Sequence, residues 1–251
     1  MNIPYWRVVG LTGLLLAGRA EAKEKFAPQV VTAAQVVVSR PVRELDRAAR
    51  PLRTLAKEGV REIPLGRLPR PTVRPRLLAA EKADPVVQRM FGPPSMPEPL
   101  FTFESISNLD GVYPPDVNGD VGLDHYVEMV NLHMCIYDKA TGTNVVAPFL
   151  MSSLYAAAGF GAPASTTDDG DPVVLYDHLA HRWMISQFIV SVTPCHEVIG
   201  ISQTSDPTGA WYLYDFVMPN NKMNDYPHFG MWPDGYYMTD NQFDGYSWGG
   251  A

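Results

Sequence analysis

The chain has 251 residues, with 20 Lys and Arg against 27 Asp and Glu, and a formal net charge of −7. The charge is uneven, because residues 1–100 hold 17 of the cations and 9 of the acids, whereas residues 101–251 hold 3 and 18. Aromatic residues follow the same division, with 23 of 27 after residue 100. This composition excludes one uniform domain. It also excludes nucleic-acid binding by the second part, because many cations are needed to neutralise a phosphate backbone.

The first 22 residues have the pattern of a secretory signal peptide. Arg7 gives a positive start, residues 8–18 form a short apolar run, and Ala-Glu-Ala at residues 20–22 is a cleavage site. The apolar run is shorter than the roughly 20 residues of a membrane span. We therefore expect a secreted protein, extracellular or periplasmic, with no membrane span after cleavage. An uncleaved anchor is the alternative.

Residues 23–100 are rich in Arg and Pro and contain 12 prolines. Proline at this density interrupts helix interiors and central strands, and the few aromatic residues leave little to bury. We expect an extended leader with at most one helical stretch near residues 42–60. Its positive charge suits docking on the acidic second part, and a disordered linker is the alternative.

After residue 100 the chain consists of short runs rich in Tyr, Trp, Val and Ile, separated by Asp, Asn, Gly and Pro turns. This pattern is typical of an all-β fold. Three similar runs begin at residues 125, 181 and 235, each after a turn that holds an aspartate, so their spacings are 56 and 54 residues. A period of this length resembles propeller blades with loop insertions. Chance similarity between aromatic strands is the alternative.

We therefore predict an all-β partial β-propeller of about two to three blades over residues 101–251. Because propellers close with about 4–8 blades, we expect this domain to be incomplete at its C-terminus, where the third unit stops at residues 246–251. An uncovered aromatic face and unpaired strand edges would make residues 101–251 poorly soluble on their own.

Two cysteines, Cys135 and Cys195, suit an oxidising compartment, in which an even pair favours a disulfide. Two buried thiols are the alternative. His196 follows Cys195 directly, but neighbouring residues of a strand point to opposite faces. Sequence adjacency therefore does not predict a thiol nucleophile with its base.

Several strings together give a more specific indication. They are Pro-Pro-Asp-Val-Asn-Gly-Asp-Val-Gly at residues 114–122, Gly-Asp-Pro-Val-Val-Leu-Tyr-Asp at 170–177, Asp-Tyr-Pro at 225–227 and Trp-Pro-Asp-Gly-Tyr-Tyr-Met at 232–238. The combination resembles a group of large, secreted, mostly uncharacterised bacterial proteins that look like β-propellers related to the sialidase-like (BNR-repeat) class.

The resemblance covers about residues 105–245 and implies fold and secretion rather than an activity. Members of the group often hold a cysteine in the loop before the Gly-Asp-Pro string. The corresponding residues 156–169 hold none here, which puts the Cys135–Cys195 pairing in doubt.

Enzymatic chemistry has little support in the pattern. A sialidase needs a cluster of arginines for the carboxylate of its substrate, and after residue 100 there is one arginine, Arg182, for which we expect a structural ion pair. Glycoside hydrolysis needs two carboxyl groups about 5–10 Å apart, and no spacing among the acids singles out such a pair. The six histidines form no zinc pattern.

Calcium binding is the better chemical signal. Two turns carry oxygen side chains at close spacing, and one of them alternates acidic or amide residues around a glycine. Such turns can converge on Ca²⁺, which takes about 6–8 oxygen ligands. Hydrogen bonding of Asp and Asn to their own backbone is the alternative. The predicted ligands are Asp116, Asn118 and Asp120 in the first turn and Asp168, Asp169 and Asp171 in the second.

These observations favour a secreted β-propeller-type binding or surface-interaction module, stabilised by Ca²⁺, whose aromatic and acidic loops engage a carbohydrate or a cell-surface partner. This hypothesis rests on fold analogy, and fold alone does not imply function. The alternative is a glycoside hydrolase with carboxylate catalysis, completed by blades downstream of residue 251.

Overall fold

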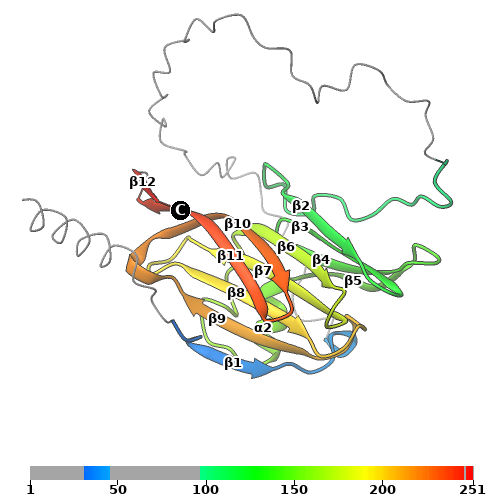
Figure 1. Cartoon of the computed structure of the whole chain (residues 1–251), viewed down its shortest axis with the longest axis horizontal. Helices are drawn as coiled ribbons and strands as arrows, with labels where there is room; N and C mark the ends of the chain where they lie inside the picture. Colours follow the sequence, from blue (N-terminus) through cyan, green and yellow to red (C-terminus); the bar gives the residue numbers. More distant parts are fainter. Residues whose placement is uncertain (1–30, 46–96, 246, 251) are drawn as a thin grey trace, which may run out of the picture. The chain divides into compact units, whose positions relative to one another are not determined.

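Antiparallel sheets make up most of the structure (Figure 1). It is a computed structural model that describes residues 31–45, 97–245 and 247–250. The predicted signal peptide and most of the predicted leader lie outside the described residues. The all-β prediction for residues 101–251 is confirmed.

The strands fall into three sheets. The first sheet has the order β2-β3-β4-β5 and is followed by the short helix α2; the second has the order β1-β9-β8-β7-β6; the third has the order β10-β11-β12. The bounds in the first sheet are β2 Val117–Val121, β3 His125–Val130, β4 His133–Asp138 and β5 Asn144–Leu150, with α2 at Met151–Ala157. Those in the second are β1 Gln35–Val38, β6 Gly170–Asp177, β7 Arg182–Ile189, β8 His196–Ser202 and β9 Trp211–Val217. Those in the third are β10 Met223–Trp232, β11 Gly235–Asp244 and β12 Ser247–Gly250.

The repeat seen in the sequence corresponds to these sheets. Its three runs are β3, β7 and β11, which pair with β2, β6 and β10 in the three sheets. The strands that precede these runs, β2, β6 and β10, also lie beside one another, because β2 contacts β6 and β6 contacts β10 (Figure 1). None of the three described sheets closes on itself, and their arrangement as propeller blades stays a prediction.

Side chains of β2 bind the backbone of β6. The Val174 N–H donates to Asn118 Oδ1 at 2.7 Å and the Tyr176 N–H donates to Asp120 Oδ2 at 2.7 Å, each bond joining residues 56 positions apart. Two backbone N–H groups of β6 thus have partners on β2, although the two strands belong to different sheets.

A hydrophobic core joins the first and second sheets and α2. Trp183 on β7 and Trp211 on β9 are fully buried. Their indole N–H groups donate to Ser205 O at 3.0 Å and Pro207 O at 2.9 Å, so both large rings are buried without an unpaired donor. The aromatic enrichment of the second part of the sequence supplies this core.

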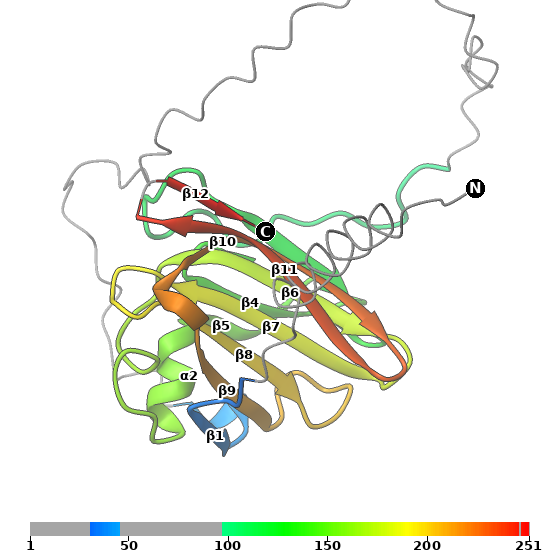
Figure 2. The same cartoon turned by 60° about the vertical axis from the view of Figure 1, so that its left-hand side comes forward.

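Strand β1 lies within the region expected to be an extended leader. It is extended, and it also pairs antiparallel with β9 as the edge strand of the second sheet, with Gln35 opposite Asp215 (Figure 2). The one-turn 3₁₀ helix η2, Val42–Glu44, follows and buries Val42. The sequence pattern missed this strand because four residues between polar and proline-rich stretches give no period.

The two cysteines are free, buried thiols. Cys135 lies on β4, where its Sγ donates to Val146 O at 3.3 Å, and Cys195 precedes β8 in the second sheet. The disulfide favoured by the even cysteine count is therefore wrong, because the two residues pack in different sheets. The alternative of two buried thiols holds.

The third sheet exposes large aromatic side chains on one face. Trp232 is 69% exposed, Tyr237 57% and Trp248 54%. The pairing of Trp232 with Gly235 and of Phe243 with Trp248 accounts for their common face, since directly opposite residues project to the same side.

Within the described residues, no helix has both the length and the apolar character of a membrane span.

Candidate functional site

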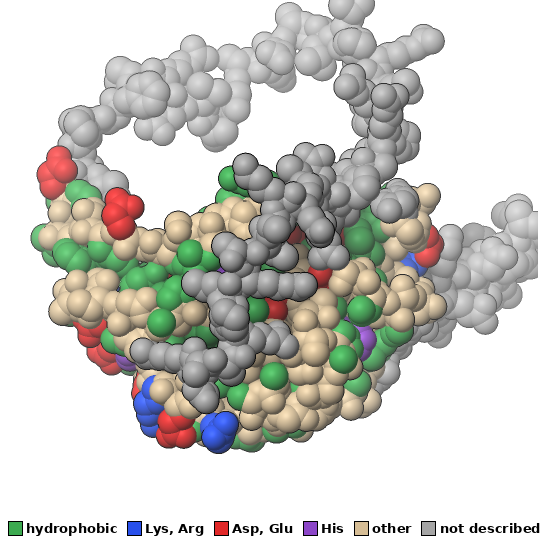
Figure 3. Space-filling model, turned by 180° about the vertical axis from the view of Figure 1, so that it is seen from behind, with side chains coloured by type: hydrophobic (Ala, Val, Ile, Leu, Met, Phe, Trp, Pro, Cys, Tyr) green, Lys and Arg blue, Asp and Glu red, His purple; other side chains and the backbone are tan. Residues whose placement is uncertain are grey.

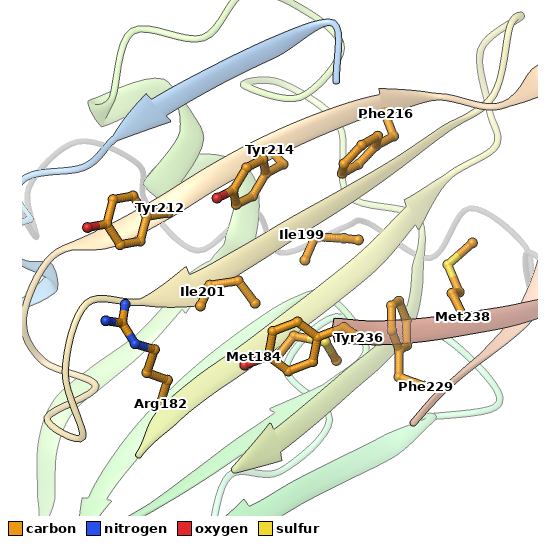
Figure 4. A pocket seen from close by; sticks show the side chains of 10 residues that line it. All are labelled: Arg182, Met184, Ile199, Ile201, Tyr212, Tyr214, Phe216, Phe229, Tyr236 and Met238. Atoms are coloured by element: carbon orange, nitrogen blue, oxygen red, sulfur yellow. The ribbon is translucent and has the colours of Figure 1, made fainter. Parts of the chain in front are cut away.

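The second and third sheets face each other across an open pocket of about 460 Å³ (Figure 4). Alternate residues of a strand share a face, so Tyr212, Tyr214 and Phe216 of β9 all project toward this pocket. Its remaining walls come from β7, β8, β10 and β11, and they are Arg182, Met184, Ile199, Ile201, Phe229, Tyr236 and Met238.

Arg182 lies at one end of the pocket, beside Tyr212 (Figure 4). The sequence favours a structural ion pair for this arginine. Its guanidinium instead donates to Ser202 O at 3.4 Å and lies 6.0 Å from the centre of the Tyr212 ring. A guanidinium carries five N–H donors, so the one bond to Ser202 leaves others to face a ligand in the pocket.

Tyr236 forms part of the opposite wall. Its hydroxyl donates to Asp177 Oδ2 at 2.8 Å. Burial raises the pKa of Tyr236, and its hydrogen bond to Asp177 adds to the effect. The ring is therefore held as a neutral phenol, fixed in orientation by a residue of the second sheet.

Several carboxyl groups lie together, and three of them come from the starts of the neighbouring strands β2, β6 and β10. Asp116 precedes β2, Asp171 lies at the start of β6 and Asp225 at the start of β10, at spacings of 55 and 54 residues. The carboxyl groups of Asp116 and Asp171 lie within hydrogen-bonding reach, so they can share one proton. Burial raises the pKa of Asp171 to about 6, and the charge of Asp116 adds to it.

Two further acids extend this group between the second and third sheets. Glu197 on β8 and Asp240 on β11 are 1% and 8% exposed. The pKa of Glu197 is raised to about 8, mainly by burial and also by the charges of Asp240 and Asp171. The Asn224 side chain donates to Glu197 Oε2 at 2.7 Å. We name Asp116, Asp171, Asp225, Asp240 and Glu197 the carboxylate group.

The first predicted calcium turn is divided by the fold. Asp116 belongs to the carboxylate group, whereas Asn118 and Asp120 accept hydrogen bonds from the backbone of β6. Asp120 Oδ1 also accepts from the Val121 N–H at 2.7 Å. Two of these three residues thus join neighbouring sheets.

The second predicted turn is divided in the same way. Asp168 is buried against Ser152 and Gln187, whose side chains donate to it. Asp169 Oδ2 accepts from the Val190 and Ser191 N–H groups. Asp171 belongs to the carboxylate group. The structure therefore brings together Asp116 and Asp171, one residue from each predicted turn.

Within the described residues, no three His, Cys, Asp or Glu side chains are grouped so that they could hold a metal ion. Calcium at the predicted turns stays a prediction.

The Lys and Arg side chains visible in Figure 3 lie near the margin of the described surface.

The adjacent Cys195 and His196 do not form a nucleophile with its base. Cys195 Sγ donates to Val192 O at 3.7 Å, whereas His196 Nδ1 lies 2.6 Å from Asp215 Oδ1. The two side chains have separate partners, as expected for neighbouring strand residues.

Sequence reasoning missed Asp225, Asp240, Glu197 and Asn224. Asp225 had a detectable signal, because it occupies the same repeat position as Asp116 and Asp171 in the Asp-Tyr-Pro string. Glu197 and Asp240 come from the second and third strands of different sheets, and no spacing in the sequence indicates that they meet.

The chain was compared with family models, with curated proteins and with solved structures, and none of them matches it.

Proposed function

We propose that this protein is a secreted binding module of the β-propeller type that binds carbohydrate in the pocket between its second and third sheets. The propeller interpretation is supported by three successive antiparallel units whose first strands are neighbours. The repeated aspartate at the start of each unit supports it as well.

The composition of the pocket wall carries the functional proposal. Three tyrosines and two phenylalanines line an open cavity of about 460 Å³ with one arginine at its end. Aromatic rings offer flat apolar faces on which the C–H side of a sugar ring can lie, while the guanidinium and the phenol groups bind its hydroxyls. An apolar cavity with a few polar groups is the usual form of a ligand site.

A glycan array probed with the full chain, followed by calorimetry on the best ligand, tests this proposal. Tyr214→Ala and Arg182→Gln should each weaken binding by about tenfold or more, because each removes one contact of the order of 1.4 kcal/mol. Tyr237→Ala is the matched control, because Tyr237 is exposed on the third sheet but does not line the pocket. Equal loss in all three variants, or no glycan binding by the wild type, would contradict the proposal.

One observation favours a glycoside hydrolase as the second candidate. Asp171 and Glu197 have raised pKa values, of about 6 and about 8, so Glu197 keeps a proton near neutral pH as a general acid must, and Asp171 is mostly ionised there as a nucleophile or base must be. Release of reducing sugar that Asp171→Asn abolishes, with glycan binding retained, would favour the hydrolase over the binding module.

Calcium stabilisation is also part of the proposal. Ligand binding to the native state raises stability, so Ca²⁺ should raise the thermal midpoint of the full chain relative to EDTA. Identical melting curves in Ca²⁺ and EDTA would remove calcium from the proposal and leave the glycan site untouched.

A further inference from the structure

Three buried oxygen atoms between the second and third sheets have no hydrogen-bond partner. They are Glu197 Oε1, Asn224 Oδ1 and Asp240 Oδ2, and the buried hydroxyl of Ser186, on the face of β7 beside Glu197, is an unpartnered donor as well. The side chains of Glu197, Asn224 and Asp240 are 1%, 0% and 8% exposed. Buried polar atoms are nearly always paired, and an unpaired one costs about 1–3 kcal/mol. Three such oxygen acceptors, two of them from carboxyl groups, make a donor set that a bound cation would satisfy.

The three residues belong to one place in the fold. Asn224 donates to the second carboxylate oxygen of Glu197 at 2.7 Å, which fixes these two side chains against each other. The charge of Asp240 acts on Glu197. The alternation of side chains along the strands also places Glu197 and Asp240 between the two sheets. Glu197 shares a face of β8 with Ile199, and Asp240 shares a face of β11 with Met238. Both Ile199 and Met238 line the pocket between the sheets.

The cations of the second part of the chain bind elsewhere. Lys222, the nearest in sequence to Asn224, donates to Gly249 O at 2.8 Å and pairs with Asp244. Arg182 binds Ser202 O, and Lys139 donates to Gly122 O at 2.8 Å. None of these three cations is therefore a counter-ion of the two buried acids.

We infer that Glu197, Asp240 and Asn224 form a calcium site that joins the second sheet to the third. The donors are two carboxylates and one amide oxygen, the ligand types that Ca²⁺ takes in proteins. Mg²⁺ fits less well, because it demands a near-ideal octahedron, whereas Ca²⁺ accepts a flexible arrangement of oxygen ligands. A cavity of about 280 Å³ lined by Tyr226, His228, Thr239, Asp240 and Asn241 gives an entry path.

None of the three residues of this site belongs to the two predicted calcium turns. The site has two acidic side chains and one amide rather than three acids. Water and backbone carbonyl groups would complete the coordination shell, as is common for Ca²⁺. Asp171 and Asp225 lie close enough to affect the pKa of neighbouring members of the carboxylate group, so they add negative charge around the ion.

The test is calorimetric titration of the full chain with Ca²⁺ after treatment with EDTA, together with thermal melting. Wild type should bind Ca²⁺ and melt at a higher temperature with it. Glu197→Gln and Asp240→Asn should each lose about one equivalent of Ca²⁺ or bind it at least about tenfold more weakly. In EDTA these variants should melt no lower than the wild type, because each keeps the shape of the side chain and places no ionisable group in the buried position.

Glu128→Gln is the matched control. Glu128 is 4% exposed and also has an unpartnered carboxylate oxygen, but it lies on β3 in the first sheet. It should keep the Ca²⁺ stoichiometry and affinity of the wild type. The inference is overturned if the wild type binds no Ca²⁺, if a folded Glu197→Gln or Asp240→Asn chain binds it as the wild type does, or if Glu128→Gln loses it equally. Circular dichroism shows whether a variant is folded. One folded variant, Glu197→Gln or Asp240→Asn, is enough for the test.

Discussion

Gly122, directly after β2, allows the first sheet to approach two buried rings of the second. A Cβ atom at this position would lie 2.5 Å from Trp183 Cζ2 and 3.1 Å from Tyr176 Cδ2. The backbone of Gly122 is not in the left-handed region, so Gly122→Ala changes the space that the residue fills and leaves its conformation allowed.

The cost of this substitution follows from how firmly the rings are held. Trp183 is fully buried, its indole N–H donates to Ser205 O, and its backbone N–H donates to Ser202 Oγ at 2.7 Å. An added methyl group in a packed core costs about 1–3 kcal/mol. Replacing glycine with alanine returns about 0.4–1 kcal/mol through the unfolded chain. We therefore expect Gly122→Ala to lower the free energy of unfolding by about 1–2 kcal/mol.

Urea unfolding followed by tryptophan fluorescence and circular dichroism measures this difference. Gly230→Ala is the control, because a Cβ at Gly230 would meet no atom within 4 Å. Its midpoint should be unchanged or slightly higher than that of the wild type. If the two variants unfold at the same urea concentration, the close packing of the first sheet on Trp183 is refuted.

Three further outcomes are expected. In EDTA, the free energy of unfolding should fall as the pH rises from about 5 to about 8. The reason is that native Glu197, with a pKa of about 8, keeps a proton that the same side chain in the unfolded state, with a pKa near 4.5, has lost. Urea titrations of Glu197→Gln should show no such slope, and an unchanged slope in the variant would contradict the assignment. Asp215→Ala should cost about 3 kcal/mol, because it leaves buried His196 without its partner at 2.6 Å; a loss below 1 kcal/mol would contradict this. Dithiothreitol should not shift the melting temperature, because Cys135 and Cys195 are free thiols, and a clear fall would restore the disulfide.

The sequence allowed the fold class and the repeat to be predicted because strand patterns are local. The runs that begin near residues 125, 181 and 235 became β3, β7 and β11, and their aspartate-bearing turns lie between strands. Strand β1 could not be predicted in the same way, because only its pairing with β9 makes it a strand. The disulfide failed for a related reason, since a count of cysteines contains no information about which sheet each one enters.

The candidate site shows where local reasoning ends. Asp116 and Asp171 were singled out as calcium ligands for their turn sequence, and the fold brings these two together. Asn118 and Asp120 have the same residue types, yet their oxygens accept hydrogen bonds from β6. Whether an acidic side chain joins sheets or faces another acid depends on which strands are neighbours. That property belongs to the topology and is not visible in a turn.

The position of β1 has a consequence for the order in which the chain folds. The Trp211 N–H donates to Ser39 Oγ across a separation of 172 residues, so the first described strand must wait for nearly all of the others to be synthesised. Contacts of such long range slow folding, because a large loop must close before they form. Until then β9 has an open edge, at which a nascent chain can pair with another copy of itself. Pulse-labelled hydrogen exchange should therefore find the amides of β1, and those of β9 that bond to β1, protected after those of β6, β7 and β8.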